Sequence, residues 1–196
     1  MKGQFVLMTG GASGSSAATA RALLAQGALP LLLDCDSANL AATAAALIGV
    51  DAFCLDVTDY AACQAAVSQT LAAHGRIDVV RANAGIASSG PLLLTDLDAF
   101  KRCVEVNVFG TLNIVRAALP AVAAQRGYVL ATASVSSFAH PAAVSSYAAS
   151  KAAIEAMCNC CRIELAAHGV LQGLFTHRGR KRHWSPRATC TRPLCA

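Results

Sequence analysis

Short apolar runs alternate along the chain with longer segments that are rich in alanine and carry scattered polar residues. The runs, which predict buried β-strands, lie at residues 4–8, 31–34, 51–56, 77–83 and 127–133. The longer segments predict helices at residues 17–25, 59–74, 96–122 and 145–168. Because strand and helix alternate throughout, the strands should run parallel, with helices on both faces of one sheet. The pattern predicts an α/β fold with a doubly wound parallel sheet of about five strands.

The alternation of strand and helix stops near residue 172. Residues 173–196 show no apolar periodicity and are rich in Arg, His, Pro and Cys. Of the 16 Lys and Arg, ten precede residue 174, as do all 11 Asp and Glu, so the other six fall in this last segment. The net charge of +5 therefore belongs to the tail. We expect one domain over residues 1–172 and a disordered basic tail over 173–196.

A turn rich in glycine and serine follows the first predicted strand. Residues 9–16 read Thr-Gly-Gly-Ala-Ser-Gly-Ser-Ser and lead directly into the first predicted helix. A strand, a glycine turn and a helix in this order present backbone N–H groups and a positive dipole end to a pyrophosphate. Gly10 and Gly14 would allow the tight turn and the close approach of a phosphate. An ordinary surface loop is the alternative for this segment taken alone.

A carboxylate closes the second apolar run. Asp34 follows the glycine turn by about twenty residues, where a dinucleotide-binding fold places an acid on the ribose hydroxyls. Such a carboxylate accepts hydrogen bonds from a diol and repels a 2′-phosphate, which favours NAD over NADP. Asp36 is a competing candidate, but Asp34 directly follows the apolar run and is preferred.

A tyrosine and a lysine stand four residues apart in the last predicted helix. Tyr147 and Lys151 would share one helix face, where the lysine ammonium favours the phenolate form of the tyrosine. The tyrosine could then pass a proton to or from a substrate oxygen. Ser134 ends the strand predicted over residues 127–133, and ligand-binding groups gather at such strand ends. A solvated helix face is the alternative for the Tyr–Lys pair alone.

Taken together, these motifs resemble those of the short-chain dehydrogenase/reductase family. The family's glycine motif, Thr-Gly-x-x-x-Gly-x-Gly, is matched at residues 9–16 with Ser16 in its last position. Its motifs after the third and fourth strands are matched by Asp56-Val57 and Asn83-Ala84-Gly85. Its helical asparagine and its Ser, Tyr and Lys are matched, in order and spacing, by Asn107, Ser134, Tyr147 and Lys151. The resemblance covers about the first 170 residues and implies a Rossmann-type fold.

The resemblance also implies the reaction, which is reversible hydride transfer between an alcohol or carbonyl carbon and the nicotinamide C4. Tyr147 would exchange the substrate proton, Lys151 would assist it and bind the nicotinamide ribose, and Ser134 would hold the substrate oxygen. Asn107 would hold a proton-relaying water, or join helix to strand as a buried amide. The residues implied to bind NAD, with NADP less favoured, are Gly10, Ser13, Gly14, Ser15, Asp34, Asp56, Val57, Asn83, Ala84, Gly85, Tyr147 and Lys151.

Two departures from the family pattern change the expectation for this chain. Ser16 replaces the third glycine, and its side chain should crowd the cofactor turn. Beyond residue 170 the family's C-terminal strands and its Pro-Gly turn are not recognisable, so we expect these strands to be missing and catalysis to be impaired. The composition of the tail suggests a shifted reading frame, with an evolved basic tail as the alternative.

Two other functions compete with that of a dehydrogenase. If the substrate pocket is incomplete, the chain is a non-catalytic dinucleotide-binding fragment. The basic tail could instead bind a nucleic acid or an anionic surface, but it has one aromatic residue, Trp184, and no recognisable motif. We therefore expect a small-molecule alcohol or carbonyl substrate and no nucleic-acid partner. By resemblance, the helices over 96–122 and 145–168 could pair two copies of the chain.

The cysteines and the N-terminus bear on the compartment. The nine cysteines are odd in number and lie mostly in apolar segments, which suggests reduced thiols in a cytoplasmic protein. Cys158, Cys160 and Cys161 share one predicted helix and are interpreted as packing residues. The tail holds His177, His183, Cys190 and Cys195 in a spacing that fits no zinc site, so no metal is expected. The N-terminal apolar run is too short for a secretion signal, and we expect no membrane span.

Overall fold

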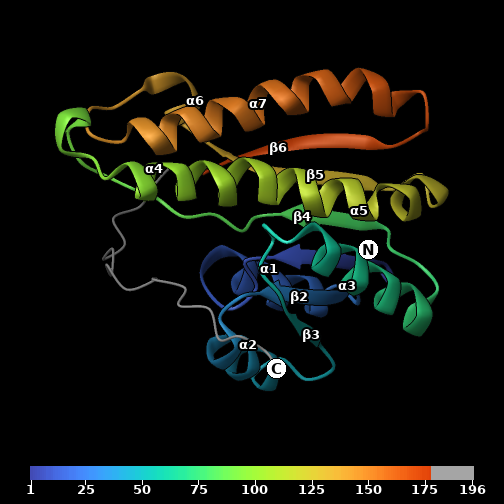
Figure 1. The fold of residues 1–196 in the computed structure, drawn as a ribbon. Coiled ribbons are helices and arrows are strands. Elements are labelled where there is room, and N and C mark those ends of the chain that lie inside the picture. Colours follow the sequence, from blue (N-terminus) through green and yellow to red (C-terminus); the bar gives the residue numbers. More distant parts are fainter. Residues whose placement is uncertain (178–196) are drawn as a thin grey trace.

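The computed structural model describes residues 1–177 of the 196-residue chain and contains one parallel sheet with helices on both faces (Figure 1). The strand order is β3-β2-β1-β4-β5-β6, and all neighbouring pairs run parallel. The strands are β1 (Phe5–Thr9), β2 (Leu29–Asp34), β3 (Asp51–Cys54), β4 (Val79–Ala82), β5 (Tyr128–Ser134) and β6 (Leu171–His177). The helices are α1 (Gly14–Ala25), α2 (Ser37–Ala45), α3 (Tyr60–His74), α4 (Leu97–Val104), α5 (Gly110–Ala124), α6 (Ser136–Ala139) and α7 (Ser145–Ala166), with short turns η1 (Leu92–Leu94) and η2 (Glu105–Phe109). The predicted α/β fold is confirmed.

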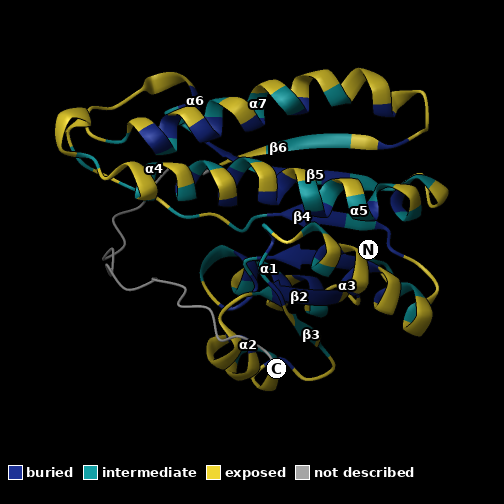
Figure 2. Ribbon diagram, in the orientation of Figure 1, coloured by how far each residue is buried: buried dark blue, intermediate teal, exposed yellow. Residues whose placement is uncertain are grey.

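Two apolar layers fill the space between the sheet and its helices. One layer packs α3, α5 and the end of α7 on one face of the sheet, and the other packs α1 and α2 on the opposite face. Figure 2 shows β1, β2 and β4 as buried and the outward faces of the helices as exposed. Successive strands are added on one side of β1 as far as β3 and then on its other side from β4 onward. A doubly wound fold opens its binding crevice at this switch point between β1 and β4.

The sixth strand contradicts the prediction that about five strands are retained. Residues 171–177 pair in register with residues 128–134, so the expected domain end at residue 172 falls inside β6. Pairing of the backbone, rather than an apolar pattern, holds this strand. A Cβ at Gly173 would lie 1.7 Å from the Tyr128 hydroxyl, so a larger residue there would force the Tyr128 side chain to move. The disorder expected for the tail beyond residue 177 lies outside the described residues.

The long helix predicted over residues 96–122 is a helical stretch with a π-helical turn in its middle. That turn, η2, joins α4 to α5 and carries Asn107. Contrary to expectation, the stretch Leu97–Ala124 is long and apolar enough to cross a membrane by length and composition. Ile114, Ala118 and Val122 of this stretch are buried in the layer shared with α3, as in a core helix.

The interpretation of the α7 cysteines as packing residues holds for one of the three. Cys158 is buried against Ala131 of β5 and Ile154 of α7. Cys160 is exposed, and Cys161 is only partly buried at the edge of the core. Among residues 1–177, no cluster of His, Cys, Asp and Glu could hold a metal ion. The other three residues considered for zinc, His183, Cys190 and Cys195, lie outside the described part.

Candidate active site

A pocket of about 920 Å³ opens at the carboxyl ends of β1, β2 and β4. It brings together, from separate segments of the sequence, ten of the residues expected to bind NAD. These residues are Gly10, Ser13, Gly14, Ser15, Asp34, Asp56, Val57, Asn83, Ala84 and Gly85. Tyr147, Lys151, Ser134 and Asn107 do not line this pocket. Lys151 and Asn107 lie against the wall of this pocket, at Gly85 and Ile86.

The glycine turn leaves the start of α1 open to the pocket. Gly10 and Gly14 both have positive φ angles, 68° and 62°, which favour glycine. A Cβ on Gly10 would also lie 3.1 Å from Asn83 Nδ2. Ser13 occupies the N-cap position without a side-chain capping bond, and no acidic residue stands in the first turn of α1. The positive end of this helix therefore faces the pocket without a side-chain cap or an acidic residue in its own first turn.

Thr9 fastens the glycine turn to the end of β4. Its hydroxyl, which is buried, accepts hydrogen bonds from the backbone N–H groups of Asn83 and Ala84, each at 2.9 Å. Ser16 is also buried, and its hydroxyl donates to the Thr9 carbonyl at 3.0 Å. The protein therefore holds the serine that replaces the family's third glycine through this hydrogen bond, and the crowding of a bound cofactor stays a prediction.

Asp34 stands at the end of β2 with both oxygens held. One oxygen accepts a hydrogen bond from the Ala12 N–H at 2.9 Å and the other from the Asp36 N–H at 3.1 Å. The competing carboxylate of Asp36 is engaged elsewhere, because it caps α2 through the Asn39 N–H and side-chain amide. These hydrogen bonds from Asn39 hold the pKa of Asp36 below its ordinary value. Both carboxylates thus line the pocket with their oxygens hydrogen-bonded inside the protein.

Asp56 is anchored by an arginine that sequence reasoning missed. One carboxylate oxygen accepts from the Thr58 N–H and hydroxyl, and the other pairs with Arg102 at 2.7 Å. Burial raises the pKa of Asp56, but these hydrogen bonds outweigh it and lower the pKa overall. Arg102 also pairs with Glu105 at 3.1 Å and lines the pocket. Its position 46 residues from Asp56 gives no local signal in the sequence.

Lys151 and Tyr147 are neighbours on α7, as their spacing predicts. The Lys151 Nζ lies 5.7 Å from the centre of the Tyr147 ring and donates to the Thr132 carbonyl at 2.8 Å. The lysine is 3% exposed, and burial lowers its pKa to about 8. A Cβ on Gly85 would lie 3.5 Å from the Nζ, so the lysine amine lies close to Gly85 of the pocket wall.

Ser134 and Asn107 complete the predicted catalytic set. Ser134 is buried at the carboxyl end of β5, and its hydroxyl accepts from the Ser136 N–H at 3.1 Å. Asn107 is fully buried and bonds both the N–H and the carbonyl of Ile86, at 2.8 and 3.0 Å. It also donates to the Ser150 hydroxyl at 2.8 Å. Asn107 thus joins the π turn to α7 and to the loop after β4, the structural alternative that its position allowed.

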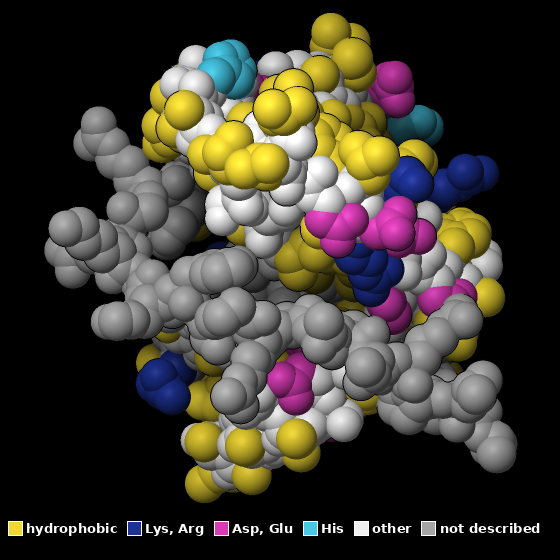
Figure 3. Space-filling model, turned by 60° about the vertical axis from the view of Figure 1, so that its left-hand side comes forward, with side chains coloured by type: hydrophobic (Ala, Val, Ile, Leu, Met, Phe, Trp, Pro, Cys, Tyr) yellow, Lys and Arg dark blue, Asp and Glu magenta, His cyan; other side chains and the backbone are white. Residues whose placement is uncertain are grey.

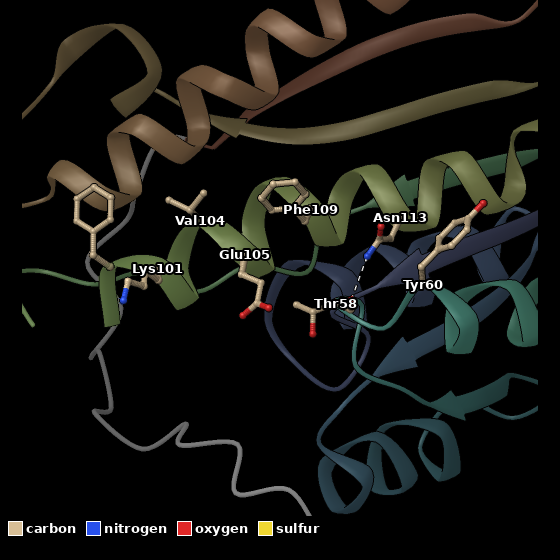
Figure 4. A pocket seen from close by; sticks show the side chains of 8 residues that line it. Thr58, Tyr60, Lys101, Val104, Glu105, Phe109 and Asn113 are labelled. Atoms are coloured by element: carbon tan, nitrogen blue, oxygen red, sulfur yellow. Dashed lines mark hydrogen bonds between the residues drawn. The ribbon is translucent and has the colours of Figure 1, made fainter. Parts of the chain in front are cut away.

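A second pocket, of about 640 Å³, lies along α4, η2 and the start of α5 (Figure 4). It holds none of the predicted site residues. Phe100, Val104 and Phe109 give it an apolar wall, and Asn113 closes it by donating to the Thr58 carbonyl at 3.3 Å. This pocket faces outward on a helical stretch that was expected to pair two copies of the chain.

Comparison with known proteins supports the arrangement. The family model for short chain dehydrogenase matches residues 4–172. The NAD(+)-dependent 2-dehydro-3-deoxy-L-rhamnonate dehydrogenase of Sphingomonas sp. (strain SKA58) is 32% identical over 89% of this chain and 71% of its own. The 3-hydroxyacyl-CoA dehydrogenase type-2 of Bos taurus is 35% identical over 87% of this chain and 70% of its own.

Solved structures agree with these relatives. A short chain dehydrogenase from Mycobacterium smegmatis has a TM-score of 0.85 and 31% identity, covering 89% of this chain and 76% of its own. A Burkholderia phymatum short chain dehydrogenase/reductase in complex with NAD has a TM-score of 0.86 and 27% identity, covering 89% and 65%. The chain therefore belongs to the short chain dehydrogenase family.

Proposed function

We propose that this protein uses NAD to oxidise an alcohol, or to reduce a carbonyl, with Tyr147 as its acid/base residue. Membership of the family makes it an oxidoreductase that takes a nicotinamide cofactor. The proposal rests above all on one pocket that joins an uncapped helix start, the Asp34 carboxylate and the loop next to Lys151. These residues fit a dinucleotide, because the positive helix end suits a diphosphate and Asp34 suits a diol.

The charges around Asp34 favour NAD over NADP. Five aspartates line the pocket, namely Asp34, Asp36, Asp56, Asp96 and Asp98. Arg102 is the one Arg or Lys among the described lining residues, and it is already paired with Asp56 and Glu105. A 2′-phosphate would therefore meet repulsion without a free cation to offset it. The name of the Sphingomonas relative also specifies NAD(+).

The catalytic roles follow from how the side chains are held. The nicotinamide supplies the hydride acceptor or donor when it is bound. Tyr147 exchanges the hydroxyl proton of the substrate, and Ser134 donates a hydrogen bond to the substrate oxygen. Lys151 has one of its three N–H groups on the Thr132 carbonyl, which leaves two for the ribose and for the phenol. Asn107 holds α7 and the loop after β4 in fixed relative positions through its hydrogen bonds to Ser150 and Ile86.

The substrate side of the site carries exposed apolar residues. Figure 3 shows apolar side chains gathered on the face that carries η1 and the start of α4. Large apolar residues exposed there are Leu92, Leu93, Leu94 and Leu97. This surface follows the pocket-lining Ser88 in the chain and favours a substrate with an apolar part. We also propose a cytoplasmic location and pairing of two copies through the α4–α5 stretch and α7.

Titration of the protein with NADH and with NADPH, followed by fluorescence, tests the cofactor proposal. We expect NADH to bind at least about tenfold more tightly, the effect of one close charge pair at the pocket surface. Asp34→Asn removes the charge but keeps an acceptor for the Ala12 N–H, so it should narrow the difference between the cofactors. Asp59→Asn, which alters the capping carboxylate of α3 outside the pocket lining, is the matched control. Tighter binding of NADPH by the unaltered protein would contradict the proposal.

A further inference from the structure

A buried arginine lies in the middle of the sheet. Arg81 of β4 is 4% exposed and stands between the buried residues Val80 and Ala82. Its register partners on the adjacent strands, Met8 and Leu130, are both apolar. A guanidinium carries its charge at all pH values at which proteins fold, so this position holds a permanent cation in an apolar layer.

The partners of this cation are all neutral. Its Nη1 donates to the Ser15 carbonyl at 3.3 Å, and its Nη2 contacts the Ser15 hydroxyl at 3.4 Å and Asn83 Oδ1 at 3.3 Å. The guanidinium also lies 5.7 Å from the centre of the Phe175 ring. Within residues 1–177, no carboxylate comes within 4.0 Å of it. Three long hydrogen bonds to neutral acceptors are weak compensation for a buried charge.

The surroundings of Arg81 add a second positive charge, which further favours a negatively charged partner. Ser15 is the second residue of α1, so the guanidinium lies at the positive end of that helix. The first turn of α1 holds no acidic residue. Two like charges, one whole and one partial, therefore meet beneath the glycine turn. Both Ser15 and Asn83 line the pocket, whereas Arg81 lies behind them.

We propose that Arg81 is a positioning residue for the diphosphate of the dinucleotide, acting from behind the glycine turn through Ser15 and Asn83. The inference rests on the proposed function, since it requires a dinucleotide in this pocket. The bound diphosphate would supply the negative charge that residues 1–177 do not place within 4.0 Å of Arg81. The positive field of the guanidinium adds to that of the helix end, so the anion is held more tightly than by the helix alone.

Arg81 also fixes the orientation of the Asn83 amide. Asn83 Oδ1 accepts from Arg81, from the Ser15 hydroxyl and from the Thr132 hydroxyl, at 3.3, 3.2 and 3.1 Å. With its oxygen committed to three donors, the amide turns its Nδ2 toward Gly10 and the turn. The Thr132 carbonyl in turn accepts from Lys151. One network thus connects the diphosphate end of the site with the catalytic lysine.

Calorimetric titration with adenosine and with ADP separates a charge effect from a structural one. Arg81→Met should weaken ADP binding about tenfold, the effect expected for one charge at this range, and leave adenosine binding unchanged. Arg81→Lys should keep most of the ADP affinity. Arg21→Met, on the exposed side of α1, is the matched control and should change neither. Equal loss of adenosine and ADP binding in Arg81→Met, or full retention of both, would overturn the proposal.

Thermal unfolding with inorganic pyrophosphate provides a second readout that does not depend on Arg81→Met. Ser15→Asp places a carboxylate beside Arg81 and at the helix start, so the ligand-free variant should melt higher than the unaltered protein. The same variant should gain less stability from pyrophosphate. A lower melting temperature for ligand-free Ser15→Asp would contradict the inference that Arg81 lacks a counter-charge in the ligand-free protein. If the unaltered protein gains no stability from ADP or NADH, both the cofactor proposal and the Arg81 proposal fail. If ADP stabilises the protein but its affinity is the same in Arg81→Met, only the Arg81 proposal fails.

Discussion

At the scale of single residues, the proposed roles assign proton exchange to Tyr147 and most of cofactor binding to other groups. Tyr147→Phe removes the phenolic oxygen and keeps the ring that packs near Lys151. Turnover of a secondary alcohol with NAD should fall by at least about two orders of magnitude, the usual contribution of a general acid/base. NADH affinity should change less than twofold by fluorescence titration. Tyr128→Phe, which alters the tyrosine over Gly173, is the control, and substantial turnover by Tyr147→Phe would remove Tyr147 from this role.

Lys151 makes stability depend on pH. Burial lowers its pKa from 10.5 to about 8, so between these values the unfolded chain binds more protons than the folded one. The free energy of unfolding contributed by this group therefore rises as pH increases from about 8 to 10.5. Lys151→Met should remove that rise. Urea unfolding of both proteins at pH 7, 8, 9 and 10 measures the difference, and parallel profiles would contradict the assignment.

At the scale of elements, the π turn and the start of α5 hold the loop after β3 against the pocket. A Cβ on Gly110 would lie 2.5 Å from the Val57 Cγ2, so Gly110→Ala should push α5 away from that loop. We expect a loss of about 1–3 kcal/mol in the free energy of unfolding, with weaker NADH binding because Val57 lines the pocket. Combining it with Val57→Ala should recover much of the loss. Additive losses in the double variant would show that the contact is not the cause.

The elements also show where prediction from sequence succeeds and where it stops. Five strands and the main helices follow from apolar runs, because their residues face cores on both sides of the sheet. The π turn at Glu105–Phe109 leaves no mark on that pattern, since it shifts the helix by one residue within an apolar stretch. β6 was missed because it depends on backbone pairing with β5 and on Gly173 beneath Tyr128.

In the candidate site, too, some residues could be predicted from the sequence and others could not. The motif residues, from Gly10 to Lys151, could be found because each lies at a strand end or on a helix face with known spacing. Arg81 and Arg102 could not, because their partners are distant in the chain. Arg102 meets Asp56 across 46 residues, and Arg81 meets Ser15 across 66. The hydrogen bond of the Ser16 hydroxyl to the Thr9 carbonyl could not be predicted either, because the motif alone does not reveal that acceptor.

At the scale of the whole molecule, β6 carries the folded unit past residue 172. Residues 173–177 complete the pairing with β5, and Leu174 packs on the small core of Ala131, Ile154 and Cys158. A chain ending at residue 172 loses these pairs, opens the edge of β5 and exposes that core. A chain ending at residue 177 keeps all of them. The two chains therefore differ by five residues that sequence reasoning assigned to a disordered tail.

We expect the 1–172 chain to melt at least about 5 °C below the 1–177 chain, because a loss of 1 kcal/mol already shifts a domain of this size by a few degrees. It should also elute as aggregates in size-exclusion chromatography, since the open edge of β5 can pair with another chain. NADH binding measured on both chains links stability to function, because β5 carries Ser134 and the Thr132 carbonyl that holds Lys151. The full 196-residue chain serves as the reference. Equal melting temperatures and equal elution of the two shorter chains would place the end of the folded domain at residue 172 and make β6 dispensable.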